Sequence, residues 1–170
     1  VDGDNLTYSV VTQPSNGSVS VSGSMFTYTP TANWNGADSY TYKANDGTVD
    51  SNTSTVSTSV AAVNDAPVSN DISRSTNKNT AIAVELSAND VESSTLTYSI
   101  VSSPSNGSLG SVSGATVTYT PTANWNGADT FTFKANDGTD DSNTSTVTVT
   151  VVSVNDAPVT TNVNQTVDED

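Results

Sequence analysis

The stretch TVTVTVV, residues 146–152, decides the fold class of this chain. Val147, Val149 and Val151 alternate with threonine, which is the period-two pattern of a strand that buries one face. Hydrophobic residues make up only 33% of the chain and are dispersed among Thr, Ser and Asn. This mixture suits half-buried strands better than helices. We therefore predict an all-β protein.

Similar runs recur upstream and are separated by turn signals. They are AIAVELS from Ala81, LTYSIVS from Leu96, TVTYT from Thr116 and TFTFKA from Thr130. The segments SNGS, NWNGAD and NDG between them are rich in the residues that form turns. With an initial strand over residues 68–72, residues 66–156 hold about seven short strands, the number typical of a β-sandwich.

The chain also repeats itself. TPTANWNGAD at residues 29–38 recurs at residues 120–129, and KANDGT at Lys43 recurs at Lys134, a shift of 91 (134 minus 43). SNTSTV and VNDAPV keep the same shift. A period of this length is a whole small domain rather than a solenoid unit, so we expect domains arranged in tandem.

The phase of the repeat predicts the domain boundaries. Residues 1–65 form a repeat that lacks its first two strands, residues 66–156 form a complete repeat, and residues 157–170 supply the first-strand segment of a third. The linker VNDAPV ends each of the first two, and its proline predicts a short, extended hinge. We expect the fragment to come from a longer array.

Aromatic residues mark the predicted core. Phe131 and Phe133 alternate on one strand, as Tyr40 and Tyr42 do in the first copy. Trp125, like its counterpart in the first copy, lies in a loop rich in Gly and Asn, where a single large aromatic usually covers core. We predict that it closes the end of the sandwich.

The composition narrows the possible partners and chemistry. Eighteen acids against four bases give a net charge of −14, so nucleic acid and anionic membrane surfaces would be repelled and cations are the expected partners. The chain has no Cys and no His, which excludes catalytic triads and thiol chemistry and disfavours zinc and copper. No apolar run approaches a membrane span. We expect neither membrane insertion nor enzymatic activity.

Acids and asparagines concentrate in turns and linkers. If the strands alternate in direction, three separate segments meet at the end where the complete repeat begins, and they contribute Asn64, Asp65, Asp90, Glu92 and Asp137. The other end receives Asp129, Asn155 and Asp156, together with the NKN turn. Clustered carboxylates repel one another unless a cation lies between them. Ca²⁺ fits best because it takes six to eight oxygen ligands; the alternative is that Asp and Asn only form turns.

Two long motifs carry a family resemblance. ANDVESSTLTYSIV and KANDGTDDSNTSTVTVTVVSVNDAP resemble the cadherin stretches that hold its acidic motifs and its linker. With PSNGS, YTPTANWNGAD and DED, the whole chain resembles the cadherin-like tandem repeats of large bacterial surface and biofilm adhesins of the RTX type. The resemblance implies immunoglobulin/cadherin-like Greek-key sandwiches that bind calcium, lie outside the cell at its surface, and hold an adhesive tip away from it.

The resemblance also assigns roles to individual residues. It places Asp90 and Glu92 in a two-acid motif, Asp137 in a turn, Asn64 and Asp65 in the linker, and Asp38 and Asp129 before the sixth strand. The matching acids of the first copy are Asp2, Asp4 and Asp46, and Asp168 and Glu169 lie in the DED of the third.

The chain departs from the cadherin pattern at its second linker. Where the tail has DED, the complete repeat has NKN, which puts Lys78 near the position of a ligand glutamate. We therefore expect the junction at Asn155 to bind calcium more weakly than the junction at Asn64, or not at all. Alanines and a serine at other linker positions also imply fewer ions per junction.

Two hypotheses about function follow. The first is a structural extender of a surface adhesin, whose partners are calcium and the neighbouring repeats. The alternative is a ligand-binding module for a glycan, a protein or ice, which would use exposed threonine rows such as that of Thr146, Thr148 and Thr150. The open sheet edge of the first copy further predicts head-to-tail self-association, in which residues 157–170 dock on a neighbouring molecule.

Overall fold

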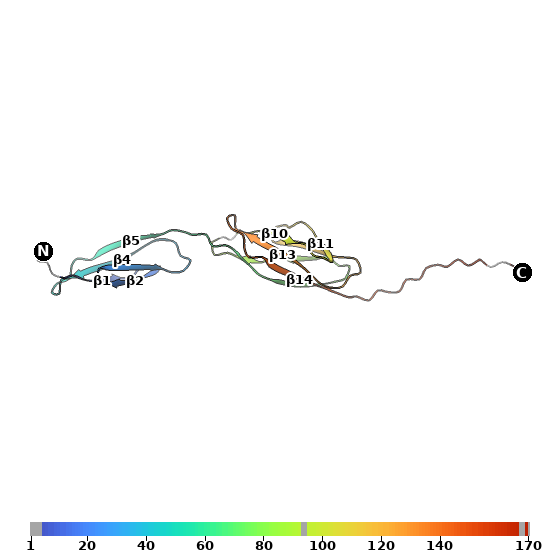
Figure 1. Ribbon diagram of the computed structural model, residues 1–170, viewed down its shortest axis with the longest axis horizontal. Helices are drawn as coiled ribbons and strands as arrows, with labels where there is room; N and C mark the ends of the chain where they lie inside the picture. The colour runs from blue at the N-terminus through green and yellow to red at the C-terminus, as the bar shows by residue number, and fades with distance from the viewer. Residues whose placement is uncertain (1–4, 93–94, 167–168, 170) are drawn as a thin grey trace. The chain divides into compact units, whose positions relative to one another are not determined.

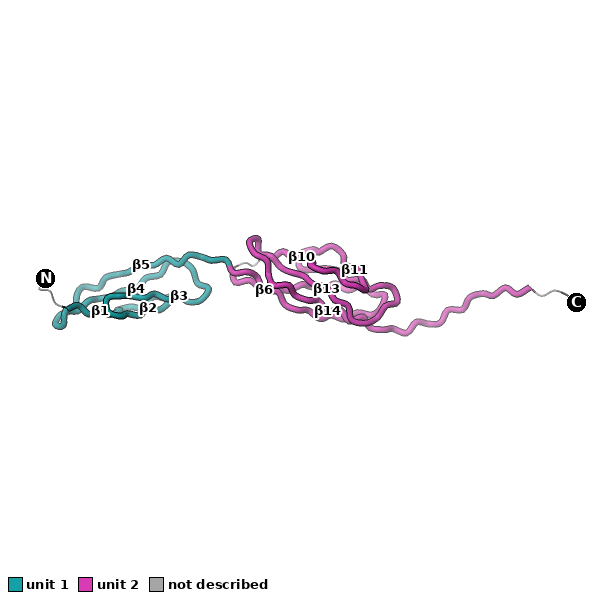
Figure 2. The backbone as a smooth tube through the Cα atoms, in the orientation of Figure 1, with its two compact units in different colours: residues 1–64 teal, residues 65–170 magenta. Residues whose placement is uncertain are grey.

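The computed structural model describes residues 5–92, 95–166 and 169. The predicted site residues Asp2, Asp4 and Asp168 lie outside this part of the chain. All regular elements of the described residues are strands, so the all-β prediction is confirmed. The chain divides into two compact units, Val1–Asn64 and Asp65–Asp170, drawn in teal and magenta in Figure 2. The boundary lies inside the first VNDAPV linker.

The second unit, which contains β10, β11, β13 and β14 in Figure 1, is a sandwich. Its main sheets hold four and three strands. One sheet has the order β10-β13-β14-β7, the other β11-β12-β8, and β6 pairs with β9 beside them. The strands are β6 (Val68–Ser69), β7 (Ile72–Asn77), β8 (Ile82–Glu85), β9 (Ala88–Asn89), β10 (Thr97–Ser102), β11 (Gly107–Leu109), β12 (Thr116–Pro121), β13 (Gly127–Asn136) and β14 (Ser145–Val152).

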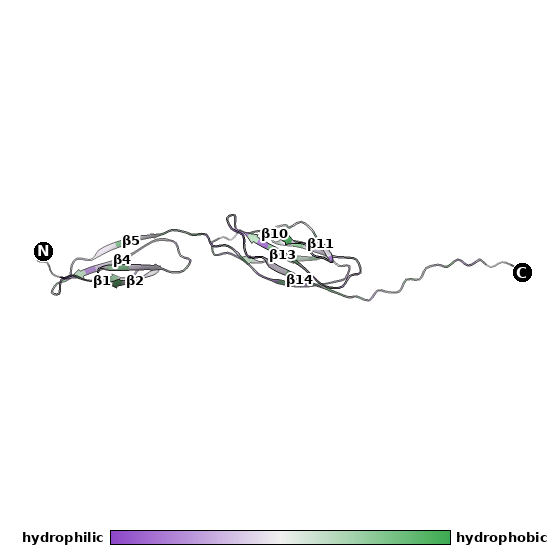
Figure 3. Cartoon of the chain, in the orientation of Figure 1, coloured by the Kyte–Doolittle hydropathy of each residue, from purple (hydrophilic) through white to green (hydrophobic). Residues whose placement is uncertain are grey.

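Both sheets contribute to one core. The valines of the opening stretch, Val147, Val149 and Val151, are buried on β14, while the threonines between them are not. The core continues through Phe131 and Phe133 on β13, as predicted, and is covered from the other sheet by β8 and β12. Many of the apolar residues, green in Figure 3, lie on strands.

The strand that closes the larger sheet is parallel to its neighbour. β7 runs beside β14 with Ile72 opposite Val147 and Asn77 opposite Val152, whereas the other pairings in this sheet are antiparallel. The predicted single strand over residues 68–72 is therefore split. β6 pairs with β9, and only after Asn70 and Asp71 does the chain join β14 as β7.

The first unit has the same plan with fewer strands. β1 (Thr7–Thr12), β4 (Gly36–Asn45) and β5 (Ser54–Val60) form one sheet in the order β1-β4-β5, and β2 (Gly17–Ser22) pairs with β3 (Met25–Pro30). Phe26 joins the two sheets, with its ring centroid 4.9 Å from that of Tyr42 and 5.9 Å from that of Tyr40. Tyr40 is buried, but Tyr42 and Phe26 are only half-buried.

The tryptophan loop is shaped by its positive-φ residues. Asn124 has φ 62° and Gly127 has φ 139°, conformations that suit asparagine and glycine. A Cβ atom on Gly127 would lie 3.0 Å from the ring of Trp125. The tryptophan packs partly buried against the core, which confirms its predicted position.

A buried carboxylate fastens the SNGS turn to the sandwich. Asp129 on β13 is 4% exposed, and it accepts hydrogen bonds from the backbone N–H groups of Ser105 (3.0 Å) and Asn106 (2.8 Å) and from the hydroxyl of Tyr119 (3.0 Å). Burial, followed by this hydrogen bond, raises the pKa of Tyr119. Asp38 makes the same three contacts in the first unit.

Two short strands were missed by the sequence analysis. β9 has two residues, too few to show alternation. β11 begins at Gly107, within the segment that was interpreted as a turn. Gly107 lies directly beside the ring of Tyr119, since an added Cβ would be 2.5 Å from its Cε2 atom and 2.8 Å from the carbonyl oxygen of Thr120.

The close approach at Gly107 can be tested by substitution. We expect Gly107→Ala to lower the free energy of unfolding of the second unit by about 1–3 kcal/mol, because the methyl group forces apart a packed ring and strand. Gly110→Ala is the matched control: its Cβ would find Thr118 at 3.7 Å, and the change should stay within about 0.5 kcal/mol. Urea unfolding followed by Trp125 fluorescence in a Trp34→Phe background reports this unit alone; equal effects of the two substitutions would contradict the packing described.

The structural role of Asp129 gives a second prediction. Asp129→Ala removes the acceptor of three N–H groups, those of Ser105, Asn106 and Thr130, and of the Tyr119 hydroxyl. We expect it to cost about 3 kcal/mol of unfolding free energy. Tyr119→Phe removes a single hydrogen bond and should cost about 1 kcal/mol. Calcium titration calorimetry on the folded Asp129→Ala variant should match the parent chain. Lost calcium binding with unchanged stability would assign Asp129 to a metal instead.

Candidate functional site

The acids at the start of the second unit form a hydrogen-bonded chain. The backbone N–H of Asp65 donates to Oε2 of Glu92 (3.1 Å), and the backbone N–H of Glu92 donates to Oδ1 of Asp90 (2.9 Å). Asp90 follows β9, and the pairing of β9 with β6 brings it back to the segment that begins at Asp65. The structure thus joins three of the predicted site residues from two segments.

Asp137 holds its own turn together. Its Oδ1 atom accepts hydrogen bonds from the N–H groups of Thr139 and Asp140, both at 2.7 Å, around Gly138 with φ 104°. Asp46 does the same in the first unit, and the N–H groups of Val49 and Thr48 lower the pKa of its carboxyl. In both turns the atom that accepts these hydrogen bonds is Oδ1, of Asp137 and of Asp46.

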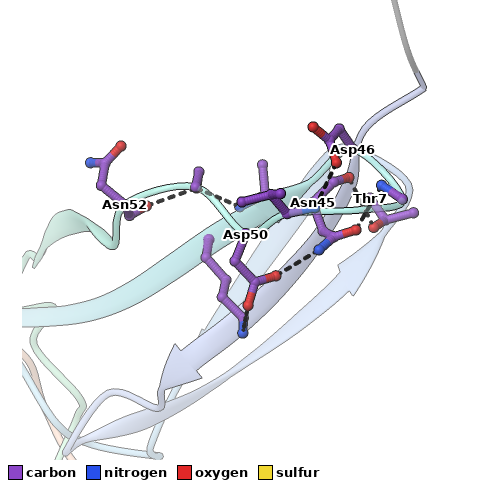
Figure 4. A network of polar contacts seen from close by, with 10 residues as sticks. Thr7, Asn45, Asp46, Asp50 and Asn52 are labelled. Atoms are coloured by element: carbon purple, nitrogen blue, oxygen red, sulfur yellow. Dashed lines mark hydrogen bonds and ion pairs between the residues drawn. The ribbon is translucent and has the colours of Figure 1, made fainter.

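An ion pair beside each of these turns was not anticipated. Lys43 contacts Oδ2 of Asp50, while the side-chain amide of Asn45 donates to Oδ1 at 2.8 Å (Figure 4). The lysine, then the asparagine, lower the pKa of Asp50. Lys134, Asn136 and Asp141 repeat the arrangement in the second unit. The signal in the sequence was a Lys and an Asp seven residues apart in both copies.

At the other end of the second unit, a lysine meets the linker. Nζ of Lys78 lies 2.5 Å from Oδ2 of Asp156, and the Lys78 side chain is only 12% exposed. Its backbone N–H donates to the carbonyl of Val152 (2.9 Å), which fixes the NKN turn at the end of β14. Asn79 and Asn124 exchange two hydrogen bonds beside it. Asn155 and Glu169 are exposed.

Asp38 is held much as Asp129 is. Partial burial would raise the pKa of its carboxyl, but the N–H groups of Asn16, Ser39 and Ser15, together with the Tyr28 hydroxyl, outweigh this effect and lower it. Burial and then the Asp38 carboxylate raise the pKa of Tyr28. The carboxylates of Asp38 and Asp129 thus each hold a turn to the rest of the fold.

The carboxylates of Asp65, Asp90 and Glu92 have the oxygen donors that a hard cation prefers. Within residues 5–92, 95–166 and 169, no three Asp or Glu side chains are close enough together to hold a metal ion. The linked acids Asp65, Asp90 and Glu92 nevertheless supply carboxylate oxygens from two segments, which is the donor chemistry of calcium. Asn64 is the last residue of the first unit.

Solved structures resemble the chain in fold. Human mucin-like protocadherin EC1-2 aligns with TM-score 0.51 and 18% identity, over 88% of this chain and 85% of that one. The protocadherin gammaB7 EC3-6 cis-dimer structure aligns with TM-score 0.53 and 18% identity, over 87% and 41%. An endo-fucoidan hydrolase from glycoside hydrolase family 107 reaches only TM-score 0.39 at 21% identity, and this chain spans 24% of its length.

The protocadherin similarities concern the fold of the chain. A search of curated proteins found no match. The described residues include no helix that could cross a bilayer. Immunoglobulin-like and cadherin-like folds are typical of extracellular, non-enzymatic modules, and the predicted sandwich of this kind is confirmed.

The family is shown by the sequence of both repeats. The model of the bacterial Ig domain family matches residues 1–59 and again residues 64–150. The two matches cover most of the chain and follow its internal repeat. The chain therefore belongs to the bacterial Ig domain family, with two copies in tandem.

Proposed function

We propose that these repeats are calcium-stiffened spacers in a bacterial cell-surface adhesin of the RTX type, where they hold adhesive domains away from the cell during adhesion and biofilm formation. The observation that carries the proposal is the chain of contacts from Asp65 through Glu92 to Asp90, placed where one bacterial Ig unit follows another. Tandem units of this kind, typically extracellular, support the role of a spacer.

The residues that would hold calcium are Asp65, Asp90, Glu92 and Asp137, with Asn64 from the linker. A bound ion would supply positive charge to acids that otherwise repel one another. The protein contributes the geometry around it. Asp90 orders the backbone of Glu92, and Glu92 accepts from the backbone of Asp65, so the linker and the loop after β9 already share one network.

At the other end of the second unit, we infer that a lysine takes the place of the metal. The Lys78 ammonium neutralises the carboxylate of Asp156 directly. Because this side chain is largely shielded from solvent, its charge would also repel a divalent ion from that site. The two VNDAPV linkers would therefore differ in their calcium dependence.

Calcium should stabilise the second unit measurably. At a concentration about 100-fold above its dissociation constant, binding adds about 2.7 kcal/mol, which for a unit of this size raises the Tm on the order of 10 °C. Thermal melting with calcium and with excess chelator measures this shift. Glu92→Gln should abolish it, whereas Glu85→Gln, the same change at an exposed position on β8, should not. If the Tm is the same with calcium and with chelator, these acids only form turns and the proposal is wrong.

The two linkers can be compared directly. By titration calorimetry, Asp65→Ala should weaken calcium binding at least tenfold, whereas Asp156→Ala should leave it unchanged because Lys78 already pairs with that carboxylate. Lys78→Glu removes the competing ammonium and should add calcium binding at the second linker. If Asp65→Ala and Asp156→Ala weaken calcium binding equally, the inference that Lys78 takes the place of the metal at the second linker is wrong.

A further inference from the structure

The second unit holds two strands near its entry and exit side by side and parallel. The chain enters this unit at Asp65 and leaves the sandwich after β14. β7 pairs with β14 over six residue pairs, from Ile72 opposite Val147 to Asn77 opposite Val152. The incoming chain therefore reaches this pair of strands at the end where Val147 lies, and the outgoing chain leaves at the end where Val152 lies.

This arrangement decides how tension acts on the unit. When the two flanking segments are pulled apart, β7 is drawn one way along its axis and β14 is drawn the other way. The hydrogen bonds between the strands then share the force and break together, because each is lost when its atoms separate by less than about 1 Å beyond their normal distance. Strands pulled apart from one end lose their bonds one at a time, so they yield at a smaller force.

The backbone of β7 faces β14 at alternate residues. The N–H of Lys78, directly after β7, donates to the carbonyl oxygen of Val152 at 2.9 Å. Since successive N–H groups of a strand point in opposite directions, those of Arg74 and Thr76 also face β14, and that of Ser75 faces away. Among the described residues, no strand pairs with the other side of β7. The N–H of Arg74 therefore belongs to the interface with β14, whereas that of Ser75 does not.

Side chains extend this interface at its entry end. Asn143, just before β14, accepts from the N–H of Ser69 through Oδ1 (2.9 Å) and donates to the Ser69 carbonyl through Nδ2 (3.1 Å). The Ser69 hydroxyl donates to the carbonyl of Asn143 (2.7 Å). Two residues later, Oδ1 of Asp71 accepts from the N–H of Thr146 (2.7 Å). These contacts join the incoming chain to β14 ahead of the first backbone pair.

Part of the entry contact is shielded from water. Ser69 and Ser145 are 4% and 2% exposed, and their hydroxyl oxygens lie 2.8 Å apart. An exposed hydrogen bond that opens exchanges its partner for water at small cost, whereas a buried group that loses its partner carries its full desolvation cost. The hydroxyl contact at Ser69 therefore resists opening more strongly than the same bond would at the surface.

We propose that the parallel pair of β7 and β14, with Asn143 and Asp71 at its entry end, is a mechanical clamp that lets the second unit withstand tension between its two linkers. The clamp goes beyond the proposed spacer role and rests on it only for the source of the tension, since a spacer transmits any pull on the adhesive domains that it holds. The contacts of the clamp do not involve Asp65, Asp90 or Glu92, so it acts without calcium.

Force spectroscopy on the full chain can stretch this unit alone. The chain has no cysteine, so Val63→Cys and Val159→Cys, at side chains 76% and 90% exposed, provide attachment points that flank the unit. Thr80→Cys in place of Val63→Cys moves the first attachment to the turn after β7, beside the exit end of the interface. At one pulling speed in excess chelator, we expect the attachments at 63 and 159 to require at least about twofold more force than those at 80 and 159.

Proline substitutions in the first geometry test the interface itself. Arg74→Pro removes an N–H that faces β14 and should lower the unfolding force to about half. Arg74→Ala controls for the side chain and Ser75→Pro for proline on the side away from β14. Both should stay within about 20% of the parent force. Asn143→Ala should also lower it, whereas Asn52→Ala, the equivalent change in the first unit and outside the stretched segment, should not.

Three results would overturn the proposal. They are equal unfolding forces in the two attachment geometries, equal losses from Arg74→Pro and Ser75→Pro, and an unchanged force for Asn143→Ala. The comparison of geometries leaves β7 intact, so it decides the matter even if Arg74→Pro does not fold. Because every measurement is made in excess chelator, failure of the proposed calcium role would leave these results unchanged.

Discussion

The structure depends on covering the apolar face of each sheet. Strands that alternate Val or Phe with Thr bury one side only, so a sheet is stable when a second sheet and complete edges enclose that side. In the second unit β7 and β8 complete the enclosure, and Val84, Val117 and Val147 are fully buried. In the first unit, β3 and β4 alternate as β12 and β13 do in the second, but its described residues form no counterparts of β7 and β8. Its aromatic cluster around Phe26 remains half-buried.

The acids divide into two groups by what they contact. Asp38, Asp129, Asp50 and Asp141 are engaged by backbone N–H groups, a tyrosine or a lysine, and they hold turns to strands. At the start of the second unit, the backbone N–H of Asp65 donates to the carboxylate of Glu92, and the backbone N–H of Glu92 donates to the carboxylate of Asp90. The first group therefore serves ordinary turn and strand contacts, whereas the proposed function assigns the second group, with Asp137, to a cation.

Sequence patterns predicted the elements that alternate over several residues. β14, most of β13 and the burial of Phe131 and Phe133 followed from period two. Residues 127–129, which belong to the predicted NWNGAD turn, lie on β13 instead. Strands of two or three residues, such as β9 and β11, carry no periodicity that could reveal them. The role of Asp129 was also hidden, because its partners Tyr119 and Asn106 meet it only after the strands pair.

The contrast between the two linkers bears on how the proposed tandem spacer would respond to calcium. A calcium ion can engage six to eight oxygens from several segments at once, whereas one ammonium has three donors on a flexible stem. Lys78 joins the NKN turn to Asp156 alone. Under the proposed function, the linker at Asp65 would stiffen as calcium rises, while the linker at Asp156 would keep one modest restraint at any calcium concentration. The two VNDAPV linkers, identical in sequence, would then differ in how their stiffness depends on calcium, because the turn beside the second one carries Lys78.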